Sequence, residues 1–279
     1  MTERTMKNKN KPGKKFGQHF LIDSAIADRI VDFAELTPDD TVLEIGPGKG
    51  ILTGRLLERT GHVTAVEIDR NLSAALKSKF GGVDGFRLVE ADILGTNLGE
   101  LFRDVSRRIK VVSNLPYYIS TPVIELLCRN RHLISNAVLM LQREVASRLV
   151  AEPGSKEFGL TTLNLALSAT GQVAMHIEPE AFSPPPAVMS SVILLEFGEE
   201  MLYPLECEEI FRNITGAAFR QRRKMLRNTL VPYLVSLGVS ENDVVKMLGA
   251  AGIDPMARPE TLSPADFVNL SNAVTRALG

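Results

Sequence analysis

The stretch Val42-Leu43-Glu44-Ile45-Gly46-Pro47-Gly48-Lys49-Gly50 decides the fold class. Its first half is a short apolar run with the pattern of a buried strand, and its second half is a glycine-rich turn. The residues that follow repeat with helical spacing, at Ile51, Leu52, Arg55 and Leu56. A strand, a glycine turn and a helix in this order are typical of the first unit of a doubly wound α/β sheet, whose glycines let a ligand lie against the backbone.

Similar units continue along the chain and predict a mostly parallel, Rossmann-like sheet. Strands are expected near residues 41–45, 63–68, 86–89, 110–113 and 137–142, with helical stretches between them. Helices are also expected near 24–34, 142–150 and 160–169, and two further strands at 173–177 and 191–197. The linker 178–190 is rich in proline and too irregular to be a helix. Beyond residue 197 only helical periodicity remains, which predicts a small all-helical domain.

Polar residues stand where the predicted strands end. Glu67 closes the second strand, about 20 residues after the glycine turn, where a doubly wound fold places a carboxylate for ribose hydroxyls. Asp92 follows the third strand and Asn114 follows the fourth. Ligands of such sheets bind beyond the carboxyl ends of the strands, so we expect these side chains and Gly46 to converge on one crevice.

The tetrapeptide Asn114-Leu115-Pro116-Tyr117 follows the apolar residues 111–113 and has the chemistry to hold an amino group on a planar ring. The side-chain carbonyl of Asn114 accepts an N–H from the amine. Pro116 keeps Leu115 out of the helical region and donates no N–H, so nearby backbone carbonyls can stay available as acceptors. Tyr117 is then placed to stack on the ring.

The glycine turn argues against two common nucleotide sites. A dinucleotide site requires Gly-x-Gly-x-x-Gly, and here the last glycine is misplaced. A P-loop requires Ser or Thr after its lysine, but Gly50 follows Lys49. S-adenosylmethionine fits better, because it carries no phosphate, its ribose diol suits Glu67, and its adenine amine suits an acceptor such as Asp92.

With these features the sequence resembles the ribosomal RNA adenine N6,N6-dimethyltransferases of the KsgA type. The resemblance runs through most of the chain. The motifs that carry it are residues 15–21 (KFGQHFL), 44–48 (EIGPG), 114–122 (NLPYYISTP), 142–146 (QREVA), 182–188 (FSPPPAV) and 258–263 (RPETLS).

The resemblance implies a class I methyltransferase domain, S-adenosylmethionine as cofactor, and small-subunit (16S) ribosomal RNA as partner. Its implied cofactor site consists of the backbone of Leu21 and Gly46 with the side chains of Glu67, Asp92 and Asn114. His19 lies beside this site, at a position where many family members have Asn. Two methyl transfers to N6 of each of two adjacent adenines near the 3′ end of the RNA are implied, during ribosome assembly.

Phe182 is expected to be a second wall for the target adenine, opposite Tyr117. The prolines that follow Phe182 make a stiff, extended segment that can present an aromatic ring at a fixed height. Single-stranded bases are commonly held between aromatic faces in this way. The proposed reaction is a direct displacement, in which Asn114 and the Leu115 carbonyl align the amine and no nucleophilic side chain is required.

Composition restricts the protein class. The 279 residues suffice for a basic tail (1–20), a large methyltransferase domain (21–200) and a small helical RNA-binding domain (201–279). With 32 basic and 33 acidic residues the net charge is near zero, so RNA contacts must come from local patches. Two distant cysteines and four scattered histidines predict neither disulfides nor a metal site. No run is long and apolar enough for a membrane span, and we expect a cytoplasmic monomer.

A basic cluster is the candidate RNA contact. If residues 211–229 form one helix, Arg220, Arg223, Lys224 and Arg227 lie opposite its apolar stripe. No acid interrupts the cluster, which favours contact with RNA phosphates. The amino-terminal tail adds five lysines, at positions 7, 9, 11, 14 and 15. Nothing in the sequence accounts for Arg222.

Three alternative functions stay open at this point. A methyltransferase of large-subunit RNA would share the catalytic motifs. A non-catalytic nucleic-acid-binding relative is a second alternative, against which the intact Glu67, Asp92 and Asn114 argue. A nicotinamide dehydrogenase is least supported, because of the glycine spacing.

Overall fold

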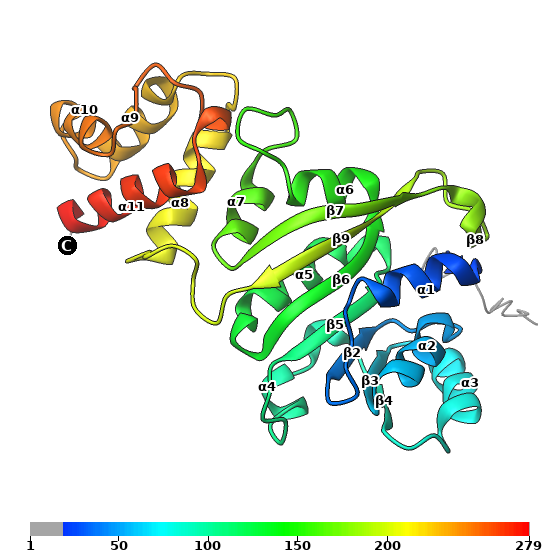
Figure 1. Ribbon diagram of the computed structural model, residues 1–279. Helices are drawn as coiled ribbons and strands as arrows, with labels where there is room; N and C mark the ends of the chain where they lie inside the picture. Colours follow the sequence, from blue (N-terminus) through cyan, green and yellow to red (C-terminus); the bar gives the residue numbers. More distant parts are fainter. Residues whose placement is uncertain (1–18, 279) are drawn as a thin grey trace, which may run out of the picture.

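A seven-stranded sheet lies at the centre of the computed structural model, which describes residues 19–278 (Figure 1). In spatial order its strands are β4 (Phe86–Glu90), β3 (His62–Glu67), β2 (Thr41–Ile45), β5 (Ile109–Asn114), β6 (Ile134–Gln142), β9 (Ser190–Phe197) and β7 (Ala169–Ile177). Neighbours from β4 to β6 are parallel, and β9 runs antiparallel to β6 and β7. The predicted strands and the mostly parallel sheet are confirmed.

Consecutive residues of the central strands enter different cores, because side chains alternate between the two faces of a sheet. In β2, Leu43 belongs to one buried cluster and Val42 to another. In β6, Leu139 and Met140 divide in the same way. Since both faces are covered, these strands read as continuous apolar runs rather than alternating ones.

Helices cover both faces of the sheet (Figure 1). In the sheet-forming part they are α1 (Ser24–Asp32), α2 (Ile51–Arg59), α3 (Arg70–Phe80), α4 (Leu98–Leu101), α5 (Ser120–Arg129), α6 (Arg143–Leu149) and α7 (Leu160–Ala166). Ile30 of α1 and Leu56 of α2 are buried in the cluster on one face. Leu127 of α5 and Leu149 of α6 are buried in the cluster on the other.

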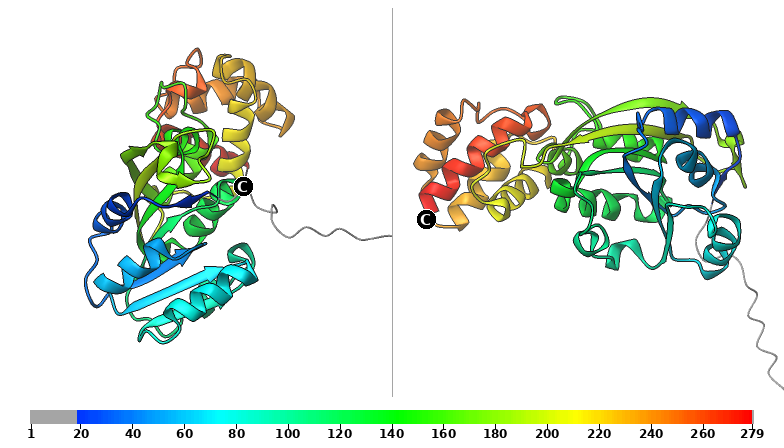
Figure 2. Two further views of the ribbon diagram at one scale, coloured as in Figure 1. Left: turned by 90° about the vertical axis from the view of Figure 1, so that its right-hand side faces the viewer. Right: turned by 60° about the horizontal axis from the view of Figure 1, so that its bottom comes forward.

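A second group of helices lies at one end of the molecule (Figures 1 and 2). It contains α8 (Glu208–Phe219), α9 (Leu226–Ser236), α10 (Glu241–Ala250) and α11 (Pro264–Leu278). Their buried side chains form a separate core, which also takes in Phe158, Leu163 and Leu167 from the preceding part of the chain. The helical character after residue 197 agrees with the sequence pattern, whereas the domain limits at residues 20 and 200 stay predictions.

The prediction of one helix through residues 211–229 is wrong. Helix α8 ends at Phe219, turns follow, and α9 begins at Leu226. The first N–H groups of α9 find acceptors elsewhere: Leu226 N donates to Ala257 O at 2.9 Å, and Arg227 N donates to Pro255 O at 3.0 Å. A distant loop therefore satisfies the new helix start, which local periodicity cannot reveal.

A short second sheet was not predicted. Strand β1 (Phe20–Leu21) pairs antiparallel with β8 (Phe182–Ser183), which lies inside the proline-rich linker. The pairing places Leu21 opposite Phe182. The amino-terminal lysines and the first part of the motif at 15–21 lie outside the described residues.

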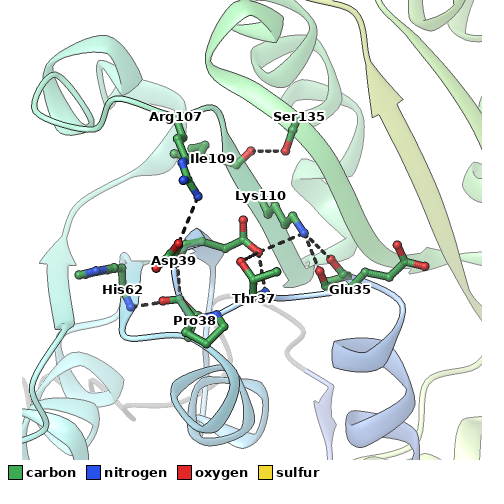
Figure 3. Close-up of polar contacts among 12 residues, drawn as sticks. Glu35, Thr37, Pro38, Asp39, His62, Arg107, Ile109, Lys110 and Ser135 are labelled. Atoms are coloured by element: carbon green, nitrogen blue, oxygen red, sulfur yellow. Dashed lines mark hydrogen bonds and ion pairs between the residues drawn. The ribbon is translucent and has the colours of Figure 1, made fainter.

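At the amino ends of the strands, Lys110 ties β5 to the loop before β2 (Figure 3). Its Nζ donates to Ala34 O at 3.0 Å and to Glu35 O at 2.7 Å, and it lies 3.2 Å from Asp40 Oδ2. Burial opposes ionisation of Asp40, but hydrogen bonds from Thr37 and the contact with Lys110 outweigh it, so the pKa of Asp40 lies below its ordinary value.

Within residues 19–278 no helix has both the length and the apolar character required to cross a membrane.

Candidate active site

A cavity of about 310 Å³ lies at the opposite, carboxyl ends of the parallel strands. Nine of the residues singled out in the sequence line it: His19, Leu21, Gly46, Glu67, Asp92, Asn114, Leu115, Pro116 and Tyr117. They come from β1 and the residue before it, and from the ends of β2, β3, β4 and β5 with the turns that follow. The strand order therefore brings together side chains that are distant in the sequence, as expected for this sheet type.

The glycine turn after β2 forms one side of the cavity. Gly46 and Gly48 have positive φ angles of 64° and 59°, which residues with a side chain rarely adopt. A Cβ atom at Gly48 would lie 3.1 Å from the ring of Phe20. The turn thus requires glycine for conformation and for space, and it exposes backbone to a ligand.

Glu67 lies at the end of β3 and is only 4 % exposed. Its Oε2 accepts an N–H from Gly48 at 3.2 Å, and its Oε1 accepts an N–H from Asp69 at 2.9 Å. Burial raises the pKa of Glu67 above its ordinary value, although these backbone hydrogen bonds oppose the shift. The carboxyl group is fixed between the glycine turn and the start of α3.

Glu44 is a second buried carboxyl group at the cavity, to which the sequence reasoning gave no role. It is 1 % exposed, and Thr53 Oγ1 of α2 donates a hydrogen bond of 2.6 Å to its Oε2. Burial raises the pKa of Glu44 to about 8, with a further contribution from the nearby Glu67. The one available signal was an acidic residue inside the apolar run 42–45.

Asp92 is exposed at the rim, where its side chain accepts an N–H from Leu94 at 3.0 Å. No basic residue among those described forms an ion pair with Glu44, Glu67 or Asp92. Three carboxyl groups therefore meet at the cavity without an ion-pair partner among the described residues, and an ionised carboxylate there suits a positively charged ligand.

Asn114 ends β5, and its amide points toward the amino-terminal strand. Its Nδ2 donates to His19 O at 3.4 Å, which directs the amide nitrogen away and leaves the oxygen as the acceptor end. Leu115 N donates to Met140 O at 3.1 Å, so the turn is attached to β6 before Pro116 redirects the chain.

Tyr117 lies beside this amide, and its ring is held on two sides. Its hydroxyl is 2.7 Å from Ser190 Oγ of β9. The His19 ring stacks on it, with the ring centres 5.7 Å apart and the planes at 28°. His19 is in turn fixed, since its Nδ1 lies 2.7 Å from Pro184 O. Burial raises the pKa of Tyr117, so the phenol stays protonated at neutral pH.

A sequence profile described as "Ribosomal RNA adenine dimethylase" matches residues 8–276. The chain belongs to this family. "Ribosomal RNA small subunit methyltransferase A" of Geobacillus thermodenitrificans (strain NG80-2) is 40 % identical to it over 265 residues, covering 94 % of this chain and 90 % of the relative. These matches make the chain a methyltransferase and confirm the resemblance given by the motifs.

Solved structures agree with the dimethylase family assignment. A dimethyladenosine transferase from Plasmodium falciparum superposes with a TM-score of 0.75 at 26 % identity, covering 90 % of this chain and 96 % of that one. The 23S rRNA methyltransferase ErmE superposes with a TM-score of 0.69 at 24 % identity, covering 92 % and 99 %, and this likeness concerns the fold alone. The predicted class I methyltransferase fold is confirmed.

The position of Phe182 differs from the expected one. Its ring is 2 % exposed, packs in the core on the α1 and α2 side of the sheet, and does not line the cavity of this dimethylase family member. Leu21, its partner in the β1–β8 pairing, is buried in the same cluster. In this structure Phe182 is therefore a core residue, and its role as a second wall for the adenine stays a prediction.

The basic residues predicted to bind RNA are all exposed, in a different arrangement from the expected one. Arg220, Arg223 and Lys224 lie in the turns between α8 and α9, and Arg227 lies in the first turn of α9. They surround the break between the helices instead of forming one helical face. Arg222, which the sequence did not explain, forms an ion pair with Glu260, with its Nη2 2.9 Å from Glu260 Oε2.

Other cavity residues were missed by the sequence reasoning. Phe20 packs against the glycine turn, and Lys49 lies 4.7 Å above its ring. Tyr118 is 54 % exposed at the cavity, next to the predicted tetrapeptide. Within residues 19–278 no group of His, Cys, Asp or Glu is arranged to hold a metal ion.

Proposed function

We propose that the protein transfers methyl groups from S-adenosylmethionine to N6 of two adjacent adenines near the 3′ end of small-subunit (16S) ribosomal RNA, giving N6,N6-dimethyladenosines during ribosome assembly. The observation that carries the proposal is one cavity that joins the glycine turn and Glu67 to Asn114 and Tyr117. The first pair suits a nucleoside cofactor, and the second pair suits an exocyclic amine on a flat base. The family membership and the name of the Geobacillus relative support the RNA substrate.

The residues of the cavity fit S-adenosylmethionine. Backbone at Gly46 and Leu21 can approach a ligand closely, Glu67 can accept from ribose hydroxyls, and Asp92 can accept from an adenine amine. Carboxylates at the cavity that form no ion pair within the described residues suit the positive sulfonium. When bound, the cofactor supplies an electrophilic methyl group.

Asn114, Leu115 and Tyr117 would prepare the target amine. The lone pair of adenine N6 is delocalised into the ring, so the amine attacks poorly until acceptors orient its hydrogens. Asn114 Oδ1 and the Leu115 carbonyl can accept these hydrogens, and stacking on Tyr117 keeps the base in one plane. Pro116 fixes the distance between the acceptors and the ring.

Alignment supplies most of the rate in this mechanism. With the amine held in line, N6 would accept the methyl group from the bound cofactor, S-adenosylhomocysteine would leave, and the N6 proton would pass to solvent. No strong general base is needed. This agrees with a tetrapeptide that offers acceptors and an aromatic ring but no ionisable group of low pKa.

The direct test is product analysis with the intact protein. Labelled cofactor would be supplied with undermethylated small subunits, large subunits or naked ribosomal RNA, and the digested RNA analysed by mass spectrometry. We expect dimethyladenosine at two adjacent sites of small-subunit RNA. Only monomethyladenosine at completion, or dimethyladenosine confined to large-subunit RNA, would contradict the proposal and favour another methyltransferase function.

We further propose that Arg220, Arg223, Lys224 and Arg227 contact RNA phosphates. Charge reversal at the last three should weaken RNA binding and flatten its dependence on salt, while cofactor affinity stays unchanged. The matched control is charge reversal at Lys77 and Lys79, two exposed lysines of α3. Equal salt slopes for both variants and the wild type would return the α8–α9 residues to ordinary solvated surface.

A further inference from the structure

The proline-rich linker was expected to carry Phe182 as one wall of the base pocket. In the structure, residues of this linker contact Tyr117, the expected opposite wall, and His19, which stacks on Tyr117. Three contacts join the segment 182–190 to residues around the cavity. Phe182 pairs with Leu21 in the small sheet, the Pro184 carbonyl lies 2.7 Å from His19 Nδ1, and Ser190 Oγ lies 2.7 Å from the Tyr117 hydroxyl.

Ser190 is the contact that acts directly on Tyr117. It is the first residue of β9, is 0 % exposed, and is held between Gln142 of β6 and Ile177 of β7. The sheet therefore fixes the backbone from which its hydroxyl projects. Tyr117, by contrast, is in a short turn and is half-buried. The hydrogen bond from this strand residue to the Tyr117 hydroxyl restrains the tilt of the Tyr117 ring.

We infer that Ser190 is a positioning residue that holds Tyr117 against the target adenine, and that the second methyl transfer depends on this support more than the first. This inference rests on the proposed function. An unmodified N6 has two hydrogens, which Asn114 and the Leu115 carbonyl can both accept. After one transfer a single N–H remains, so the base loses one hydrogen bond and depends more on stacking with Tyr117.

Three variants isolate this hydrogen bond. Ser190→Ala removes it from the sheet side, and Tyr117→Phe removes it from the ring side while keeping the stacking face. Ser191→Ala is the matched control, because Ser191 is the next residue of β9, is also 0 % exposed, and bonds the exposed His176 at 2.8 Å instead. If Ser190→Ala fails to fold, Tyr117→Phe still tests the same bond.

The measurements are kcat and KM for small-subunit RNA and the ratio of monomethyladenosine to dimethyladenosine over time. We expect Ser190→Ala to lower kcat of the second transfer about 3- to 10-fold, with a smaller change in KM, and to accumulate monomethyladenosine. Tyr117→Phe and the double variant should show the same loss, because both remove one shared bond. Ser191→Ala should match the wild type.

The outcomes separate the two proposals. Equal product ratios for Ser190→Ala, Ser191→Ala and an active wild type would overturn the role of Ser190 and leave the proposed function intact. Additive losses in the double variant would also overturn it, since the two changes would then act independently. A wild type that leaves small-subunit adenines unmethylated would overturn the proposed function, and this inference with it.

Discussion

The two ends of the parallel strands both carry acidic side chains, but in opposite settings. At the amino ends, Asp40 has Lys110 at 3.2 Å, and its pKa lies below the ordinary value. At the carboxyl ends, Glu44 and Glu67 are buried and form no ion pair with a described residue, and burial raises both pKa values. The charge of Asp40 is thus balanced by a side chain of the protein, whereas Glu44 and Glu67 have no ion-pair partner among the described residues.

The difference separates stabilising residues from ligand-binding ones. A carboxylate that forms an ion pair within the protein stabilises the fold, and its charge is already balanced, so it attracts a positively charged ligand only weakly. A buried carboxyl group without a cation lowers stability when it ionises, and a positively charged ligand can compensate for that charge. Removing a carboxylate at the carboxyl ends should therefore weaken binding without lowering the stability of the fold, whereas breaking a pair at the amino ends should lower that stability.

The largest expected effect concerns Asn114. Asn114→Ala should lower methyl transfer by orders of magnitude, because the target amine loses the acceptor that aligns it. Cofactor affinity should fall less, since Asn114 only borders that part of the cavity. Single-turnover assays and calorimetry would measure the two effects. The control is RNA binding by the variant, which should persist; an active variant would refute the orienting role.

The next effect is the pH dependence of stability that Glu44 causes. Its pKa rises from an ordinary 4.5 to about 8 in the folded protein, so the unfolded chain ionises first as the pH increases. The contribution of Glu44 to the free energy of unfolding is greatest below pH 4.5. It decreases between pH 4.5 and about 8, where only the unfolded chain is largely ionised, and is constant above that range. Glu44→Gln cannot ionise, so its stability relative to the wild type should rise across that window by on the order of a few kcal/mol.

Denaturant unfolding at several pH values would measure this difference. Thr53→Val is the matched variant, because it removes the 2.6 Å hydrogen bond that favours ionised Glu44. In Thr53→Val the pKa of Glu44 should be higher still, so the decrease in stability should continue to a higher pH than in the wild type. A constant stability difference between Glu44→Gln and the wild type from pH 5 to 9 would show that Glu44 is ionised in the folded state.

Cofactor binding through Glu67 is the third effect. Glu67→Ala should weaken S-adenosylmethionine binding by about 1.5 to 3 kcal/mol, the cost of losing hydrogen bonds to a charged acceptor. In the wild type, affinity should increase as the pH rises through the raised pKa of Glu67, because only the carboxylate has full acceptor capacity. Glu67→Gln should flatten this increase. Calorimetry decides; unchanged affinity in Glu67→Ala, with binding of NADH, would overturn the cofactor assignment.

Sequence patterns predicted the parts of the fold and site that depend on local periodicity. The five parallel strands and the convergence of Gly46, Glu67, Asp92 and Asn114 follow from apolar runs with polar ends. Strands β1 and β8 have two residues each, too few for any period, and their pairing joins positions about 160 residues apart. The prolines after Phe182 indicated an extended segment but not which way its ring faces.

Tertiary contacts also explain the remaining differences. The break between α8 and α9 depends on acceptors at Pro255 and Ala257, which no local pattern contains. The raised pKa of Glu44 depends on its burial in the folded protein. The contact of Tyr117 with Ser190 joins residues 73 positions apart. Each depends on contacts between segments that are distant in the sequence.

The smallest effect is expected at the amino ends, where the comparison predicts a loss of stability alone. Lys110→Met removes the ion pair with Asp40 and the hydrogen bonds to Ala34 and Glu35, and should cost about 1 to 2 kcal/mol of unfolding free energy at pH 7. The two paired side chains are only 14 % and 17 % exposed, so solvent screens them little.

The matched control for Lys110 is Arg107→Met, which breaks a pair with Asp39 between side chains that are 70 % and 75 % exposed. That pair should contribute less than about 0.5 kcal/mol. The pKa of Asp40 is lower in the folded protein than in the unfolded chain, so ionised Asp40 stabilises the fold at pH values above its unfolded pKa. The destabilisation caused by Lys110→Met should therefore become smaller as the pH falls through the folded pKa of Asp40. Cofactor affinity should be unchanged in both variants; a weakened affinity in Lys110→Met would mean that the two ends of the sheet are coupled, and the separation between folding and binding residues would fail.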